Sequence, residues 1–271
     1  MNERDQLRKA QLYIAEEIKR ICVANEINYF LDCGSMLGAV RHHGFIPWDD
    51  DMDIGMKKDD YSKFLQIAAY DLRSDFFLDN YDTNTDNALV FSKVRLKNTI
   101  YLETKGNMEA EHNEIFVDVF PYYFISDNEM IRRIEGIIMS VLSQAIMSKS
   151  GYRVWKGESL GKRLKFFPTD LLGACMDKKT MHHIIDHLFS KYVNTSYLCI
   201  HSGSCYGYWY FPKEVFDEFV DTEFEGHTFK IPKQYDTYLS TVYGDYMVLP
   251  PEKNRTTHLI QKLDLGEYHF E

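Results

Sequence analysis

The feature that most constrains this chain is an acidic run, Asp49 to Asp53 (DDDMD), at the start of a segment with strand character. From Asp51 to Met56 (DMDIGM) polar and apolar residues alternate, which is the period of a half-buried strand. In an extended chain, residues i and i+2 point to the same side, about 6.5–7 Å apart, so Asp51 and Asp53 are predicted to point together. Neighbouring carboxylates repel each other unless a cation lies between them, and hard cations such as Mg²⁺ prefer oxygen ligands.

A third carboxylate, Asp118, interrupts the apolar residues of Glu114 to Phe120 (EIFVDVF), a predicted strand that Pro121 is expected to end. Upstream, Gly34-Ser35 joins a predicted strand to a predicted helix, where free backbone N–H groups and the helix dipole favour a phosphate. Each feature alone also occurs in ordinary turns and edge strands. The order of strand, Gly-Ser, helix, Asp-x-Asp and a later strand with one Asp is typical of the nucleotidyltransferase fold.

Helical and strand patterns interleave through the first half of the chain, which indicates an α+β (α/β-like) fold with helices flanking a mixed sheet. The expected helices are Arg4–Asn25, Ser35–Arg41 and Lys58–Leu72, and the further expected strands are Ile27–Asp32, Phe76–Asn80, Ala88–Leu96 and Thr99–Glu103. Lys97-Asn98 predicts a tight hairpin between the last two strands. After Asp127 the pattern becomes largely helical, with Glu129–Met147 and Lys178–Tyr192 as expected helices. We therefore predict a catalytic core over residues 1–125 and a helical and irregular region over 126–271 that completes the donor and acceptor sites.

Charge and composition exclude several classes of protein. The net charge of -10 disfavours nucleic acid as a partner, because phosphate backbones are held by Lys and Arg. The five cysteines are odd in number and form no C-x-x-C pair, which favours a reduced cytoplasmic location over a disulfide framework. The charged N-terminus and the lack of about 20 consecutive apolar residues allow at most peripheral membrane contact, at the inner face of the cell membrane. Lys162 to Phe167 (KRLKFF) is the candidate for such contact.

The stretch Asp32 to Met56, DCGSMLGAVRHHGFIPWDDDMDIGM, resembles the signature of the LicD family, to which fukutin and fukutin-related protein also belong. The similarity continues through FSKVRLKNTIYLE, IFVDVFP and the tail FKIPKQYDTYLSTVYGDYMVLPPEKNRTTH, so it covers nearly the whole chain. The resemblance implies a transferase that takes a phospho-head group, usually phosphocholine from CDP-choline, to a hydroxyl of a cell-surface glycan such as lipopolysaccharide or a teichoic acid precursor, with CMP released. The acceptor can be lipid-linked.

The same resemblance implies roles for particular residues. It assigns the catalytic and metal-binding carboxylates, with Mg²⁺ or Mn²⁺, to Asp51, Asp53 and Asp118, and the phosphate-binding turn to Gly34 and Ser35. We add further candidates from their side-chain chemistry: Arg41, Lys93 and Arg95 as phosphate-binding cations, Trp48 as a stacking surface for the base, and Asp49 and Asp50 as supporting residues. For these candidates, surface charge, packing or a capping turn are the ordinary alternatives.

Three alternatives remain open at this stage. The cargo could be glycerol phosphate, ribitol phosphate or another phospho- or phosphono-alcohol carried on a CDP-activated donor. The chain could be a non-catalytic nucleotide-binding module, although such a module has no need of three carboxylates. It could also be a membrane-docking scaffold. A quaternary ammonium head group would require aromatic faces, for which the tyrosine-rich segments Tyr206–Tyr210 and Tyr235–Tyr246 are the candidates.

Overall fold

The computed structural model of the 271-residue chain describes residues 2–85, 87–103, 112–150, 169–200, 209–255 and 260–270. Its contacts divide it into two compact units. The first unit combines Met1–Leu78, Lys93–Pro121 and Glu214–Glu271. The second unit combines Asp79–Ser92 and Tyr122–Lys213.

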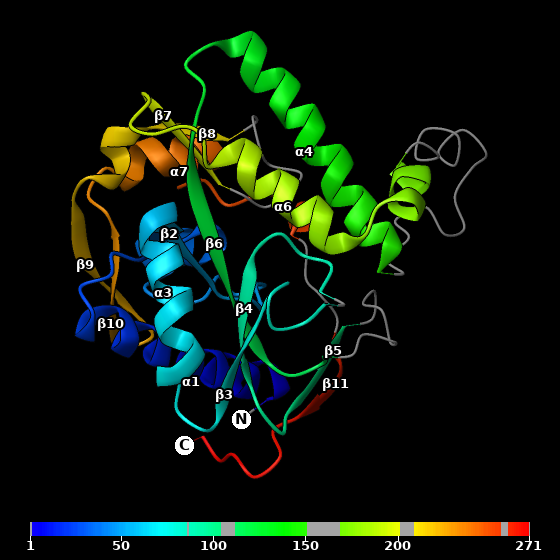
Figure 1. Cartoon of the computed structure of the whole chain (residues 1–271). Helices are drawn as coiled ribbons and strands as arrows, with labels where there is room; N and C mark the ends of the chain where they lie inside the picture. Colours follow the sequence, from blue (N-terminus) through cyan, green and yellow to red (C-terminus); the bar gives the residue numbers. More distant parts are fainter. Residues whose placement is uncertain are drawn as a thin grey trace. The chain divides into compact units, whose positions relative to one another are not determined.

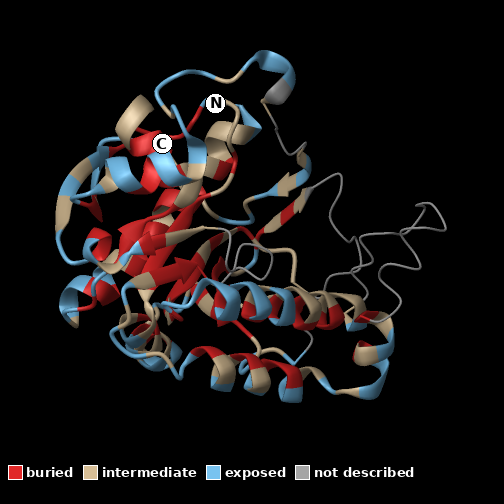
Figure 2. Cartoon of the chain, turned by 90° about the horizontal axis from the view of Figure 1, so that it is seen from above, coloured by how far each residue is buried: buried red, intermediate tan, exposed pale blue. Residues whose placement is uncertain are grey.

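The first unit is organised around strands in the order β1-β2-β6-β4-β3 (Figure 1). Their bounds are β1 (Phe30–Leu31), β2 (Asp53–Lys57), β6 (Phe116–Ile125), β4 (Ser92–Leu96) and β3 (Phe76–Asp79). Four successive residues of β2, Asp53 to Met56, are buried, so this strand is covered on both faces rather than on one. Buried residues gather on the central strands in Figure 2. Together with helices α1 (Glu3–Ala24), α2 (Cys33–His42) and α3 (Lys58–Asp71), this confirms the predicted α+β fold.

A β-hairpin and a short helix complete the surroundings of α2 in the first unit. The hairpin joins β9 (Phe219–Phe224) to β10 (His227–Pro232) through Glu225 and Gly226, whose φ angles of 51° and 77° suit a tight turn with two left-handed residues. The Glu225 carboxylate accepts a hydrogen bond from the Phe45 N–H at 3.0 Å, so the turn supports the segment after α2. Helix α7 (Tyr235–Tyr243) follows β10 and contacts α2, and η2 (Glu252–Asn254) lies further along the chain.

Two predicted features of the strands are wrong. Strand β5 (Ile100–Glu103) pairs with the C-terminal strand β11 (Ile260–Asp264), and not with β4 as the expected hairpin required. The turn itself is present, since Asn98 has a φ of 59°, but the pairing partner comes from the far end of the chain. Strand β6 also continues through Pro121. Proline removes only its own N–H, and on either side the Asp118 N–H reaches the Met52 carbonyl while Tyr122 pairs with Ile200.

The second unit packs two helices on a small sheet. Residues Tyr122–Ile125 of β6 pair with β7 (Tyr197–Ile200), which pairs with β8 (Tyr210–Pro212). Helices α4 (Glu129–Lys149) and α6 (Lys178–Phe189) contact each other, and Figure 2 shows these two helices buried on one side and exposed on the other. Their core includes Tyr123, Met139, Ile146, Met181, Ile185 and Phe189. The chain passes from the first unit to the second within β6, after Pro121, which is close to the predicted boundary near residue 125. It returns to the first unit at Glu214, although the prediction placed the whole of 126–271 in one region.

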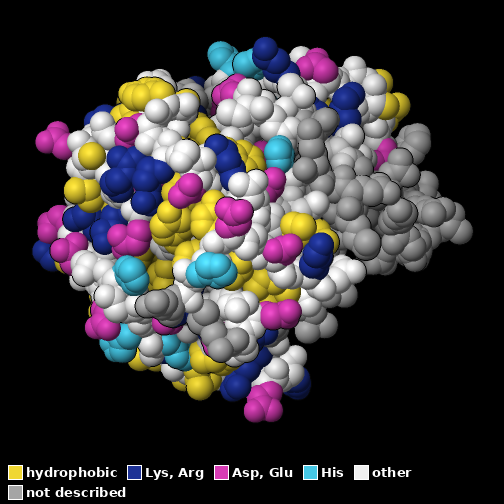
Figure 3. Space-filling model, turned by 90° about the horizontal axis from the view of Figure 1, so that it is seen from below, with side chains coloured by type: hydrophobic (Ala, Val, Ile, Leu, Met, Phe, Trp, Pro, Cys, Tyr) yellow, Lys and Arg dark blue, Asp and Glu magenta, His cyan; other side chains and the backbone are white. Residues whose placement is uncertain are grey.

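The charge of the surface and the apolar character of the helices bear on possible partners of the protein. On the face seen in Figure 3, acidic side chains lie among Lys and Arg side chains. Among the residues that are described, no helix combines the length and apolar character that crossing a membrane requires.

Candidate active site

The acidic run opens into a pocket of about 410 Å³ in the first unit. Asp49, Asp51 and Asp53 line one part of it, and Cys33 and Gly34 from the start of α2 line another. Strand β2 begins only at Asp53, so Asp51 lies in the connection before the strand and not on the strand itself. The two carboxylates nevertheless reach the same pocket, which is the convergence that the Asp-x-Asp spacing predicted.

The carboxylates in this pocket repel one another. The pKa of Asp53 is raised well above its usual value, first by burial and then by the charges of Asp51 and Asp118. Burial also raises the pKa of Asp51, followed by the charge of Asp49 and a hydrogen bond with it. This arrangement is unfavourable unless the carboxylates share protons or a cation. Its oxygen-only donor set fits a hard divalent cation such as Mg²⁺ or Mn²⁺.

Asp118 lies on β6, the strand next to β2, and its carboxylate pairs with Lys93 from β4. The Lys93 ammonium is 2.5 Å from Asp118 Oδ1 and 3.3 Å from the centre of the Phe116 ring. Arg95, on the same strand, lies over that ring at 5.3 Å and donates to the Glu114 carbonyl at 3.0 Å. In the described part of the chain, no three acidic, histidine or cysteine side chains meet in a ready metal site. The charge of Asp118 therefore helps to raise the pKa values of Asp51 and Asp53, while Asp118 itself pairs with the Lys93 ammonium.

The start of α2 is fixed by polar contacts beneath the pocket. Asp32 caps the helix by accepting from the Cys33 N–H at 2.9 Å, and the Tyr238 hydroxyl of α7 donates to the same Asp32 oxygen. Ser35 is buried, and its hydroxyl accepts from the Asp53 N–H at 2.9 Å. Ser35 thus ties α2 to the first residue of β2, and its predicted contact with phosphate stays a prediction.

Gly34 brings the backbone of α2 close to the carboxylates. A Cβ at this position would lie 2.6 Å from Asp49 Oδ2, which is closer than real Cβ contacts. A glycine is therefore required for this approach unless the Asp49 side chain moves. Because the N-terminus of a helix favours anions, the same approach suits a phosphate held between the helix and the carboxylates.

Arg41 and Trp48 also line the pocket, and both have further partners. The Arg41 guanidinium donates to the Tyr246 carbonyl at 2.6 Å and to His42 Nε2 at 3.0 Å. The guanidinium carbon of Arg255 lies 4.5 Å from the centre of the Trp48 ring. Arg41 thus binds the C-terminal segment that forms part of the pocket wall. Trp48 stacks with Arg255, which was not among the predicted residues.

The two predicted supporting carboxylates differ in position. Asp49 lines the pocket beside Asp51. Asp50 is buried, and its Oδ2 accepts from the Tyr101 hydroxyl at 3.1 Å. Asp50 therefore holds the acidic run in place through Tyr101 and does not line the pocket. Asp49 contributes its charge to the pocket.

Helix α1 holds the acidic run through residues that the sequence did not indicate. Arg8 donates to the Ile46 carbonyl at 2.7 Å and to the Asp49 carbonyl at 2.6 Å, and Gln11 donates to the Asp50 carbonyl at 2.8 Å. Burial lowers the pKa of Arg8. No local pattern marks these residues, because they belong to the polar positions of an amphipathic helix and their partners lie far along the chain.

The predicted aromatic and membrane-contact segments are described only in part. Tyr243 and Tyr246, from the Tyr235–Tyr246 segment, line the pocket. Of the Tyr206–Tyr210 segment, residues 206–208 lie outside the described residues, as does the whole of Lys162–Phe167. Besides Trp48, α7 and the segment after it therefore bring aromatic side chains to the pocket.

Known proteins are similar to this chain over the part that contains the acidic run. Residues 26–138 match the family model described as LicD/FKTN/FKRP, nucleotidyltransferase domain. The chain is 28% identical, over 277 aligned positions, to the lipopolysaccharide cholinephosphotransferase LicD of Haemophilus influenzae, which covers 94% of this chain and 97% of that protein. It is 28% identical over 109 positions to the ribitol 5-phosphate transferases FKRP of Mus musculus and Homo sapiens, covering 40% of this chain and 19% of each relative. The chain therefore resembles the LicD family, and its match to the nucleotidyltransferase domain of that family covers the part that contains Asp51, Asp53 and Asp118.

Proposed function

We propose that this protein transfers a phospho-head group from a CDP-activated alcohol to a hydroxyl of a cell-surface glycan or a teichoic acid precursor, and releases CMP. The observation that carries the proposal is the pocket in which Asp49, Asp51 and Asp53 face the N-terminus of α2 at Cys33 and Gly34. Phosphocholine is the first candidate for the head group, since LicD of Haemophilus influenzae, which is similar over 94% of this chain, is a lipopolysaccharide cholinephosphotransferase. Ribitol phosphate is the second, because of the FKRP relatives.

In the proposed reaction an acceptor hydroxyl attacks the head-group phosphorus, the bond from that phosphorus to the CMP oxygen breaks, and a carboxylate takes the hydroxyl proton. A Mg²⁺ or Mn²⁺ ion held by Asp51 and Asp53, with Asp118 beside them, would neutralise charge on the diphosphate. The α2 N-terminus would bind phosphate oxygens through its dipole and backbone N–H groups. Lys93 would orient Asp118 through their ion pair.

The proposed acceptors belong to the cell envelope, and the proposed site of action is cytoplasmic, with peripheral contact at the inner face of the membrane. Lys162–Phe167 remains the candidate segment for that contact. A fluorescent fusion followed by membrane fractionation would test this location. Recovery of the protein only from outside the cytoplasmic membrane would contradict it.

The test of the function is CMP release by the full chain with Mg²⁺, a panel of lipopolysaccharide and teichoic acid fractions, and CDP-choline, CDP-ribitol or CDP-glycerol as donor. One donor should be used at least ten times faster than the others. Asp51→Asn, Asp53→Asn and Asp118→Asn should each reduce turnover about 100-fold or more, since losing a metal ligand costs several kcal/mol of transition-state stabilisation. Asp221→Asn, an exposed carboxylate on β9, is the matched control. Folded site variants that keep turnover within a few-fold of wild type would exclude this function.

A further inference from the structure

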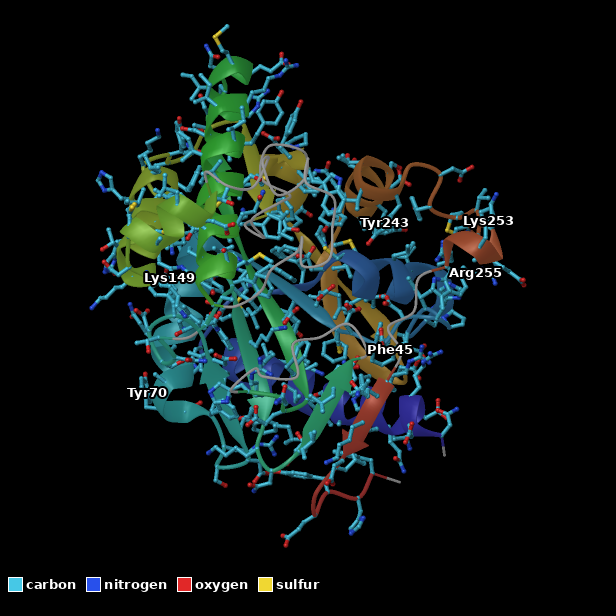
Figure 4. The ribbon with its side chains drawn as sticks, turned by 90° about the vertical axis from the view of Figure 1, so that its right-hand side faces the viewer. Phe45, Tyr70, Lys149, Tyr243, Lys253 and Arg255 are labelled. Atoms are coloured by element: carbon cyan, nitrogen blue, oxygen red, sulfur yellow. The ribbon has the colours of Figure 1, made fainter. Side chains whose placement is uncertain are left out.

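Tyr243, labelled in Figure 4, is the last residue of α7. It lines the pocket together with the carboxylates. The residue as a whole is 40% exposed. The other residues that line this pocket include Cys33 and Gly34 at the start of α2 and the carboxylates of Asp49 and Asp53. Tyr243 thus shares the pocket with both the helix N-terminus and the proposed metal ligands.

The helix that carries Tyr243 is held in place independently of the pocket. Tyr238, one turn and a half earlier on α7, is buried, and its hydroxyl donates to Asp32, the residue that caps α2. The Cys33 N–H also lies 3.3 Å from the Tyr238 hydroxyl. This contact fixes the end of α7 against the start of α2, so the Tyr243 side chain approaches the pocket from a rigid element.

The Tyr243 hydroxyl is able to donate a hydrogen bond. Among the residues that the structure describes, it has no hydrogen-bonding partner, whereas the neighbouring Tyr246 hydroxyl donates to Asp236 at 2.8 Å. A tyrosine hydroxyl has an ordinary pKa of about 10 and therefore keeps its proton at neutral pH. An acceptor between α2 and Asp53 would meet a donor that is already in position.

We infer that Tyr243 is a catalytic residue whose hydroxyl donates a hydrogen bond to a non-bridging oxygen of the phosphate group that is transferred. The inference rests on the proposed function, because a phosphate between the α2 N-terminus and the carboxylates is what brings an acceptor oxygen to this hydroxyl. A donor aimed at an oxygen that gains negative charge in the transition state accelerates the reaction more than it strengthens binding. No proton is transferred from Tyr243 in this role.

The experiment is a comparison of Tyr243→Phe with Tyr70→Phe in the full chain, using the donor that wild type accepts. Tyr243→Phe should lower kcat by about 10- to 100-fold, as expected for loss of one donor to a charged group. The dissociation constant of CDP-choline, measured by calorimetry with and without Mg²⁺, should stay within threefold, and so should that of Mn²⁺. Tyr70→Phe should keep kcat within twofold, because Tyr70 lies on α3, is 79% exposed and does not line the pocket.

Two results would overturn the inference. The first is a kcat of Tyr243→Phe within threefold of wild type. The second is a loss in kcat matched by an equal loss in nucleotide or Mn²⁺ affinity, which would mean that Tyr243 only shapes the pocket. If wild type itself released no CMP from any donor, the proposed function would fail and not the placement of Tyr243. Thermal melts of both variants, expected within a few degrees of wild type, exclude misfolding as the cause.

Discussion

The ammonium of Lys93 and the carboxylate of Asp118 form an ion pair of 2.5 Å between β4 and β6, and their side chains are only 10% and 13% exposed. The pair neutralises one charge next to the crowded carboxylates of the pocket. Asp53 in turn stabilises the charged form of Lys93, although burial and the nearby Arg95 lower the pKa of the lysine. Lys93 thus places a cation directly beside one of the proposed metal ligands.

Removing Lys93 alone should destabilise the fold. Lys93→Met leaves Asp118 charged in a nearly buried position, and breaking a buried ion pair in this way costs about 3 kcal/mol. Replacing both partners, in Lys93→Met/Asp118→Leu, should recover most of that loss. Urea unfolding of the variants measures both effects. Lys230→Met, which breaks an exposed pair with Asp221, is the control and should change stability little. Equal stability of the single and double variants would contradict this account of the pair.

Neutralising Asp53 should have opposite effects on stability and activity. Asp53 lies among like charges, so Asp53→Asn removes repulsion and should raise the free energy of unfolding of the metal-free protein by about 1–2 kcal/mol. Turnover should fall in the same variant, because the carboxylate is a proposed metal ligand. Denaturant unfolding in EDTA and the CMP assay measure the two effects. A variant that is both less stable and fully active would contradict the role of Asp53.

The raised pKa values of Asp51 and Asp53 predict a dependence of stability on pH. A carboxyl whose folded-state pKa is raised above the usual 3.8 binds its proton more tightly in the folded chain than in the unfolded chain. The contribution of such a carboxyl to the free energy of unfolding is therefore most favourable below about pH 4, and it is lost as the pH rises through the raised pKa values. In EDTA, the stability gained by Asp51→Asn or Asp53→Asn over wild type should grow with pH, and saturating Mg²⁺ should reduce that difference. Parallel pH curves for wild type and variants would contradict it.

Local patterns predicted the parts of the fold that depend on nearby residues. The apolar period of residues 4–25 predicted α1 to within one residue at each end. The alternation around Asp118 predicted the first half of β6. The partner of β5 could not be predicted, because β11 comes from the C-terminus and pairing between strands distant in sequence leaves no local signal. The prediction that Pro121 ends the strand was wrong for a related reason. Whether the missing N–H of a proline interrupts a sheet depends on the neighbouring strands, and these cannot be identified from local sequence.

The candidate site was predictable where it depends on spacing. Asp51 and Asp53 meet in one pocket with Gly34, as the order of the motifs indicated. The pairing of Lys93 with Asp118 and the stacking of Arg255 on Trp48 were not predictable, because each joins residues from separate elements. The same holds for the support that Arg8 gives to the acidic run.

Arg8 should position the acidic run without contacting a substrate. Arg8→Met keeps much of the side-chain volume but removes the donors to the Ile46 and Asp49 carbonyls, which should cost about 1–3 kcal/mol of stability. The looser segment should also bind Mn²⁺ more weakly and lower kcat about tenfold, since Asp49 and Asp51 are no longer held in the pocket. Arg4→Met is the matched control one turn earlier on α1, because Arg4 makes only a 3.4 Å contact with the Pro47 carbonyl. Calorimetry with Mn²⁺, denaturant unfolding and the CMP assay test the three expectations together. If Arg8→Met loses stability while Mn²⁺ affinity and kcat equal those of Arg4→Met, Arg8 supports only the fold, and the geometry of the acidic run does not depend on α1.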